Sequence, residues 1–211
     1  FDRTKPWLSD ENPGFGASYS NYETLVIAGN SFDYPYLHGK SIKSAGYSFV
    51  SCSLASVLEG EVSLNNYKMV DLILGKQKQT NIGIVKKDLK FKTFPLALQQ
   101  QLSKYCLSGG NLLISGAFIG SDFYKENYIN TEERIFMENI LKFKFKSKNP
   151  ILGSQVKMVN STFPQFDRAE IQLFTEPNED SYFIESTDAI EPAINGALTI
   201  CRYSNSNLSA G

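Results

Sequence analysis

Apolar and polar residues follow a strand, helix, strand order through the middle of the chain. Residues 69–74 and 111–115 are apolar runs, and residues 93–106 place apolar side chains at helical spacing. This pattern predicts two buried strands joined by a helix that Thr93 caps and that ends at Gly109. Such a βαβ unit places the two strands side by side and parallel, so that their carboxyl ends share one crevice.

The segment before this unit is richer in turns. Residues 1–40 combine aromatic residues with proline and glycine, which predicts an ordered loop that wraps the sheet. Short helices are expected near residues 41–44 and 55–59, on either side of a strand at 47–51. Six lysines in residues 76–92 predict a solvated loop after the first strand of the unit.

The last third of the chain changes period. Thr131 is expected to cap a helix that reaches Leu141, and from Phe143 onward apolar and polar residues alternate. This alternation predicts short strands at residues 143–146, 156–159, 170–174 and 198–203. The chain is therefore predicted to be α/β, with a mostly parallel sheet and a β-rich part, residues 143–211, that extends the sheet or forms a small added layer.

Composition narrows the class of protein. A chain of 211 residues with 42% hydrophobic content can bury the core of one domain, so residues 1–211 are expected to form a single unit. The net charge of −1 gives no electrostatic signature for nucleic acid, and no apolar run approaches the ~20 residues of a membrane-spanning helix. Three cysteines without CxxC spacing favour buried thiols over zinc ligands. The abrupt ends, Phe1 and Gly211, suggest an incomplete segment.

The turn after the second strand is the place where a nucleophile would stand in related α/β folds. Here the sequence is Ser115-Gly116-Ala117, so glycine occupies the apex. Ser115 and Ser121 could line the crevice, whereas the structural reading makes Ser121 or Asp122 a helix cap.

Few residues could run proton transfer. His38 is the sole histidine, so any imidazole base must be this residue. Asp71 lies within an apolar strand, where it is either a functional carboxylate or an anchor to neighbouring backbone amides; the anchor is favoured. Asp71, Asp122 and Glu126 are the candidates for a pair of carboxylates.

Four stretches of the sequence carry a family resemblance: Phe1–Arg3, His38–Gly39, Tyr67–Gln77 and, most specifically, Gly109–Asp122. They resemble secreted Bacteroidetes proteins labelled as xanthan lyases, which are often linked to golvesin-type or fibronectin-like modules. The similarity runs over most of the chain, including residues 196–211.

This resemblance implies a flavodoxin-like three-layer sandwich similar to class I glutamine amidotransferase domains. It also implies a secreted, periplasmic or cell-surface protein, and a fragment that starts just after the first strand and stops before the last. Amidotransferases of that superfamily carry an elbow cysteine and a downstream histidine. This chain has Gly116 at the apex and no histidine after His38, so the resemblance does not extend to amidotransferase chemistry.

Two functional hypotheses follow. The first is a lyase or hydrolase acting on an acidic glycan, with catalytic candidates His38, Ser115 and Asp122. The second is a non-catalytic module that binds polysaccharide or a neighbouring domain of a longer chain through aromatic rings. The missing elbow nucleophile favours the second. The candidate ligand-binding residues are Tyr34, Tyr36, Lys76, Gln77, Gly116 and Ser121. No metal or cofactor is expected.

Overall fold

The computed structural model describes residues 34–82, 88–125, 127–148, 155–159, 168–173, 187–204 and 206–211. The predicted wrapping loop lies outside these residues up to Asp33, and so does Glu126.

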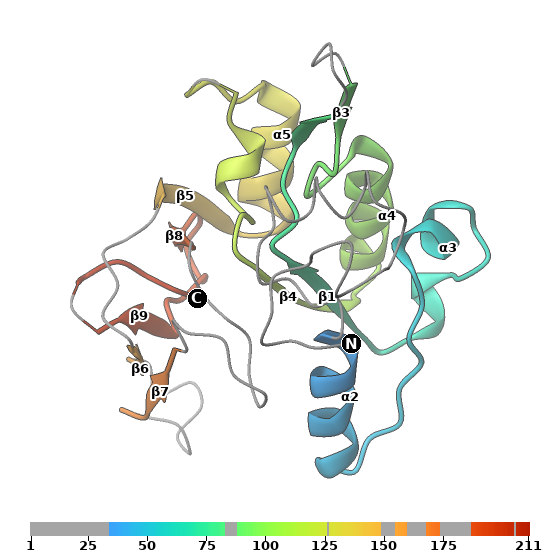
Figure 1. Cartoon of the computed structure of the whole chain (residues 1–211), viewed down its shortest axis with the longest axis horizontal. Helices are drawn as coiled ribbons and strands as arrows, with labels where there is room; N and C mark the ends of the chain where they lie inside the picture. Colours follow the sequence, from blue (N-terminus) through green and yellow to red (C-terminus); the bar gives the residue numbers. More distant parts are fainter. Residues whose placement is uncertain are drawn as a thin grey trace, which may run out of the picture.

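The centre of the fold is the predicted βαβ unit. Strand β1 (Met69–Gly75) pairs in parallel with β4 (Asn111–Gly116), from Met69 opposite Asn111 to Gly75 opposite Gly116. Helix α4 (Leu96–Leu107) connects them and lies alongside the pair (Figure 1). The prediction that these two strands lie side by side and run the same way is confirmed.

Helix α4 ends where its sequence predicts. Gly109 follows the last turn with a φ of +89°, in the left-handed region that glycine adopts at low cost. The predicted N-cap is wrong: Pro95 occupies the cap position, and Thr93 is buried two residues earlier. Thr93 makes tertiary hydrogen bonds instead of capping the helix.

The lysine-rich segment after β1 was predicted as a loop, but its described residues include two short strands. Strands β2 (Thr80–Ile82) and β3 (Asp88–Lys90) pair antiparallel within it, and Lys76 is buried. Before β1, helix α2 (Tyr34–Ser44) begins earlier than the predicted short helix, and α3 (Leu54–Leu58) lies close to its predicted place. Residues 47–51 are an exposed loop, so the strand predicted there is wrong. The short helix η1 (Leu64–Asn66) leads into β1.

The chain turns after β4 through a short helix, η2 (Ser121–Phe123), and then forms α5 (Thr131–Ile135). Helix α5 continues as a π-helical stretch, η3 (Phe136–Ile140). The predicted cap is wrong by one residue, because the side chain of Asn130 accepts the hydrogen bond from the Glu133 amide.

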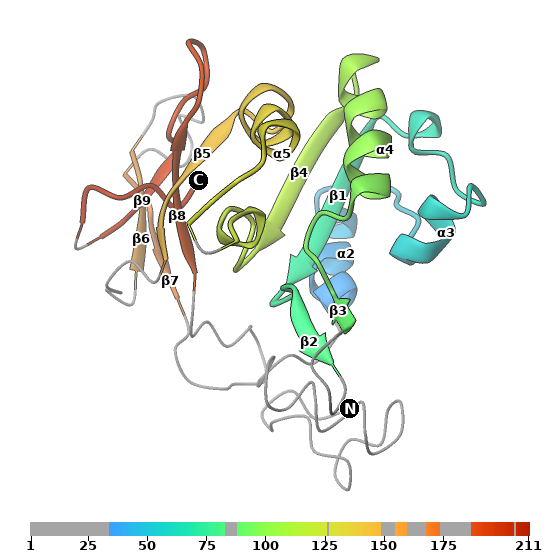
Figure 2. The same cartoon turned by 90° about the horizontal axis from the view of Figure 1, so that it is seen from above.

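The last third is rich in strands, and they pair antiparallel. Strand β5 (Phe143–Lys148) pairs with β8 (Asp188–Pro192). Strand β6 (Gln155–Met158) lies between β7 (Glu170–Gln172) and β9 (Cys201–Tyr203). Figure 2 shows these strands on the opposite side of the molecule from α4.

This pairing contradicts the expected fold class. Among the described strands only β1 and β4 are parallel, and every other ladder is antiparallel. A flavodoxin-like sandwich with a mostly parallel sheet is therefore wrong, and the described chain is a mixed α/β fold. Parallel neighbours need a long crossover, usually a helix, and the described residues after η3 form no further helix.

Candidate functional site

The turn that follows β4 is closed by packing. Ala117 donates its backbone N–H to the Gly75 carbonyl at 2.8 Å, which ties the turn to the end of β1. A Cβ atom at Gly116 would lie 2.9 Å from the Cβ of Leu74, closer than real Cβ contacts. The apex of the turn therefore has no room for a nucleophilic side chain.

A buried carboxylate occupies the backbone donors of this turn. Asp188 Oδ2, from β8, accepts the amide hydrogens of Gly120 at 2.9 Å and Ser121 at 2.7 Å. Burial raises the pKa of Asp188, while hydrogen bonds from Ser121 and Gly120 and the charge of Lys148 oppose that rise. Two converging amides could stabilise an oxyanion, but here an internal acceptor holds them.

Asp188 was missed by sequence reasoning. A signal was present, since Asp188 precedes Ala189 and Ile190 in a strand, the same apolar context that drew attention to Asp71. Its partners, 67 and 68 residues away, have no sequence signal.

Asp122 also binds backbone amides. Its Oδ1 accepts from Gln79 N at 2.8 Å and its Oδ2 from Thr93 N at 2.7 Å. Asp122 therefore joins the two sides of the segment between β1 and α4. It makes no helix-capping bond at η2, which contradicts the capping prediction for this residue.

The predicted ligand residue Gln77 takes part in the same structure. Its side-chain Nε2 donates to the Lys92 carbonyl at 2.9 Å, and its own carbonyl accepts from Thr93 Oγ1 at 3.0 Å. Lys92 forms an ion pair with Glu133, and partial burial lowers the pKa of Lys92 while the charge of Asp122 opposes that shift.

Two further predicted ligand residues are buried, Lys76 directly after β1 and Ser121 at the start of η2. Lys76 and Ser121 are each 6% exposed. The ammonium of Lys78 lies 4.6 Å from the centre of the Phe118 ring, in a cation–π contact that covers the turn.

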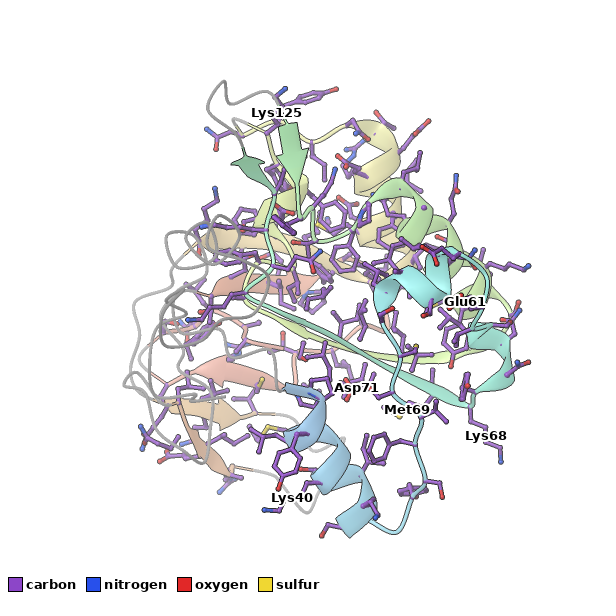
Figure 3. All side chains as sticks on the ribbon, turned by 45° about the vertical axis from the view of Figure 1, so that its right-hand side comes forward. Lys40, Glu61, Lys68, Met69, Asp71 and Lys125 are labelled. Carbon is purple, nitrogen blue, oxygen red and sulfur yellow. The ribbon has the colours of Figure 1, made fainter. Side chains whose placement is uncertain are left out.

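A histidine–aspartate pair joins α2 to β1, separate from this turn. His38 Nδ1, on α2, is 2.8 Å from Asp71 Oδ2, and their side chains are 24% and 17% exposed. Asp71 Oδ1 is buried and has no hydrogen-bond partner within the described residues. Figure 3 places Asp71 on β1 beside helix α2. The partner of this carboxylate is thus an imidazole, where an anchor to backbone amides was favoured.

Register shows which candidates share a face of the sheet. Asp71 lies opposite Leu113, and Ile73 lies opposite Ser115, so all four side chains are on the face that carries His38. Ser115 is two residues, about 6.6 Å, farther along its strand than the neighbour of Asp71. The structure therefore brings His38 and Asp71 together, places Ser115 on the same face, and leaves Asp122 in the turn.

Aromatic side chains are exposed around α2. Tyr36 is 65%, Tyr47 71% and Phe49 44% exposed. A Cβ atom at Gly39 would lie 2.4 Å from Cζ of Phe49, so this ring packs directly on the helix backbone. We call the group Tyr36, Tyr47 and Phe49, with the exposed Lys40 and Lys43 of α2, the α2 aromatic surface. The side chain of Tyr34 lies outside the described structure.

The cysteines are free thiols. Cys52 is exposed, which contradicts its predicted burial, whereas Cys106 and Cys201 are half-buried. Burial raises the pKa of both half-buried thiols, so the thiol form is favoured. Within the described residues, no group of three His, Cys, Asp or Glu side chains is placed to hold a metal ion.

No described helix combines the length and apolarity needed to cross a bilayer. Comparison of the chain with protein-family models, curated proteins and solved structures finds no match.

Proposed function

We propose that this chain is a non-catalytic module that binds a glycan through the α2 aromatic surface. The observation that carries the proposal is the exposure of Tyr36, Tyr47 and Phe49 around one helix. Tyrosine combines an apolar ring with a polar tip, so an exposed group of such rings suits a ligand with apolar C–H faces and many hydroxyls. A sugar ring has this chemistry.

The charges beside these rings favour an acidic glycan. Lys40 and Lys43 are exposed on the same helix, and Figure 3 shows Lys40 at the outer side of α2. Positive side chains next to an aromatic platform attract a carboxylated sugar and repel a cationic ligand. Export to the periplasm or cell surface is part of this proposal, and its support is the family resemblance of the sequence.

The hydrogen bonds and the packing at the turn after β4 support a binding role over catalysis. Asp188 holds the two amides that could serve an oxyanion, and both oxygens of Asp122 hold backbone amides. Gly116 has no space for a nucleophilic side chain. Catalysis at this turn would require these internal hydrogen bonds to break first.

The experiment that tests the proposal is a glycan-array screen of the full chain, with titrations on the acidic polysaccharides that bind. Tyr36→Ala and Tyr47→Ala should each weaken binding about tenfold, because each removes an exposed ring from the platform. Tyr128→Ala is the matched control, since Tyr128 is 67% exposed, lies shortly before α5 and is not part of the α2 aromatic surface. Equal binding by all three variants would refute the α2 site.

Product analysis on the same polysaccharides tests the absence of catalysis. We expect binding without new reducing ends or unsaturated sugars. Turnover that yields unsaturated products would establish a lyase and remove the non-catalytic reading.

A second candidate function, a lyase or hydrolase for an acidic glycan, is favoured by the His38–Asp71 pair. A carboxylate 2.8 Å from Nδ1 fixes the orientation of an imidazole, which is how histidine bases are positioned. If this function holds, His38→Gln should abolish product formation while leaving binding to the α2 aromatic surface within about twofold.

A further inference from the structure

The β-rich part contains an open hollow separate from the α2 aromatic surface. It has a volume of about 570 Å³ and lies over β6 and β9, and its lining includes Lys157, Thr199, Arg202, Ser204, Ser206 and Asn207. Both views place β6 and β9 to the left of α2 and apart from it (Figures 1 and 2).

Two cations stand next to each other in this lining. Lys157 of β6 lies directly opposite Arg202 of β9 in the antiparallel register. Like charges in directly opposite positions repel, so this arrangement costs stability unless an anion lies near both. On its other side, Lys157 lies opposite Glu170 of β7, with Nζ 3.5 Å from Oε1.

The hydrogen bonds of Arg202 also favour an anion at this place. Its Nε is buried and has no hydrogen-bond partner among the residues that the structure describes. A buried N–H without an acceptor is costly, and a guanidinium is suited to bind the two oxygens of a planar anion. Arg202 therefore brings a guanidinium to the lining of the hollow, and its buried Nε has no acceptor among the described residues.

The charge count and the lining define the ligand. Glu170, Lys157 and Arg202 form one row across three strands, with a net charge of +1. A single negative charge neutralises this row, whereas a phosphate dianion exceeds it. The hydroxyls and amide at the edge of the hollow, those of Thr199, Ser204, Ser206 and Asn207, suit a ligand with hydroxyl groups of its own.

We infer that this hollow binds the carboxylate of a hydroxylated acid, such as a sugar acid, between Arg202 and Lys157. Arg202 donates a charge-assisted hydrogen bond to the carboxylate, and Lys157, partly neutralised by Glu170, adds a weaker attraction. The inference goes beyond the proposed function and does not depend on it, because the α2 aromatic surface shares no residue with the hollow.

The test is a titration of the ¹⁵N-labelled full chain with D-glucuronate, followed by amide chemical shifts. Saturable shifts are expected at residues 199–204, around Arg202. D-glucuronamide, which has the same shape without the charge, should cause none, and inorganic phosphate should bind more weakly than D-glucuronate. Tighter binding of phosphate, or the absence of any saturable shift with D-glucuronate, would overturn the inference.

Variants locate the site. Arg202→Gln should weaken D-glucuronate binding about tenfold or more, and Lys157→Gln about threefold. Lys146→Gln is the matched control because Lys146 also forms a cross-strand ion pair, 3.1 Å from Glu191, with comparable exposure outside the hollow. The affinity of Lys146→Gln for D-glucuronate should stay within about twofold of that of the wild type. Lys157→Gln changes a half-exposed side chain, so it keeps the test decisive if Arg202→Gln does not fold.

The outcomes separate the two proposals. If the chain binds polysaccharide, also as Arg202→Gln, but does not bind D-glucuronate, the hollow is not a binding site and the α2 site is supported. If the chain binds D-glucuronate in an Arg202-dependent way but binds no polysaccharide, the proposed glycan-binding function is refuted and the inference about the hollow is supported.

Discussion

The region around β1, α4 and β4 and the region built from β5 to β9 are stabilised in different ways. The first has a large apolar core of Leu74, Phe94, Leu98, Leu102, Phe123, Phe136, Met137 and Phe143. The second has a small cluster of Val156, Ala189 and Tyr203. Because apolar burial is the main favourable term in folding, the β-rich region depends more on its ladders and on its contacts with the first region.

Strands β5 and β8 connect the two regions. Phe143 of β5 belongs to the large core, and the ring of Phe145 lies 5.2 Å from that of Tyr124. From β8, Asp188 reaches the turn after β4. We therefore expect the β-rich region to unfold together with the larger core, and three experiments test that dependence.

The largest expected effect comes from Phe94→Ala. Phe94 is 1% exposed, and its ring centre lies 5.2 Å from that of Phe123, on which it stacks, and 5.8 Å from that of Phe136. Its removal should lower the free energy of unfolding by about 4 kcal/mol, measured by denaturant titration. Leu96→Ala, two residues later at the first position of α4 and 60% exposed, should cost less than about 0.5 kcal/mol. If β5 to β9 keep their amide protection in Phe94→Ala while α4 unfolds, the two regions are independent.

Asp188→Ala should have the next largest effect. It leaves the amides of Gly120 and Ser121 without their acceptor in a buried place, at a cost of about 3 kcal/mol. Hydrogen exchange at these two amides should accelerate along with the loss of global stability. Glu191→Ala on the same strand removes a half-exposed ion pair and should cost about 0.5 kcal/mol. Equal losses in the two variants would show that Asp188 does not join the regions.

The smallest effect is a pH dependence. Burial raises the folded pKa of Asp188 above the unfolded value of about 4, so the folded chain binds a proton that the unfolded chain has released. The resulting stabilisation is complete below the unfolded pKa and is lost as pH rises through the folded pKa.

Comparison of the wild type with Asp188→Asn measures this effect. The free energy of unfolding of the wild type, minus that of the variant, should fall as pH rises from about 4. A difference that increases with pH would mean that the folded site favours the carboxylate.

Local signals predicted the parts of the fold whose causes are local. Apolar runs located β1 and β4, helical spacing located α4, and Gly109 marked its end. Thr93 misled because a hydroxyl suited to a cap was used in a tertiary contact with Gln77. The flavodoxin-like sandwich was wrong because strand direction depends on which strands pair, and alternation from Phe143 onward carries no information on pairing.

The candidate site was predictable only in its parts. His38 and Asp71 were each identified, but their contact joins α2 to β1 across 33 residues. Asp122 was identified as a possible helix cap, which is wrong, since its amide partners lie 29 and 43 residues away. The Lys157–Arg202 pair was missed because register decides which side chains on two strands are neighbours.

The contact between Asp188 and the turn after β4 also constrains the order of events during synthesis. The amides of Gly120 and Ser121 leave the ribosome before residue 188 has been translated. Until then water is their available partner, so this turn stays hydrated in the nascent chain. A chain truncated before Asp188 would therefore lack a finished first region, although every residue of β1, α4 and β4 is present.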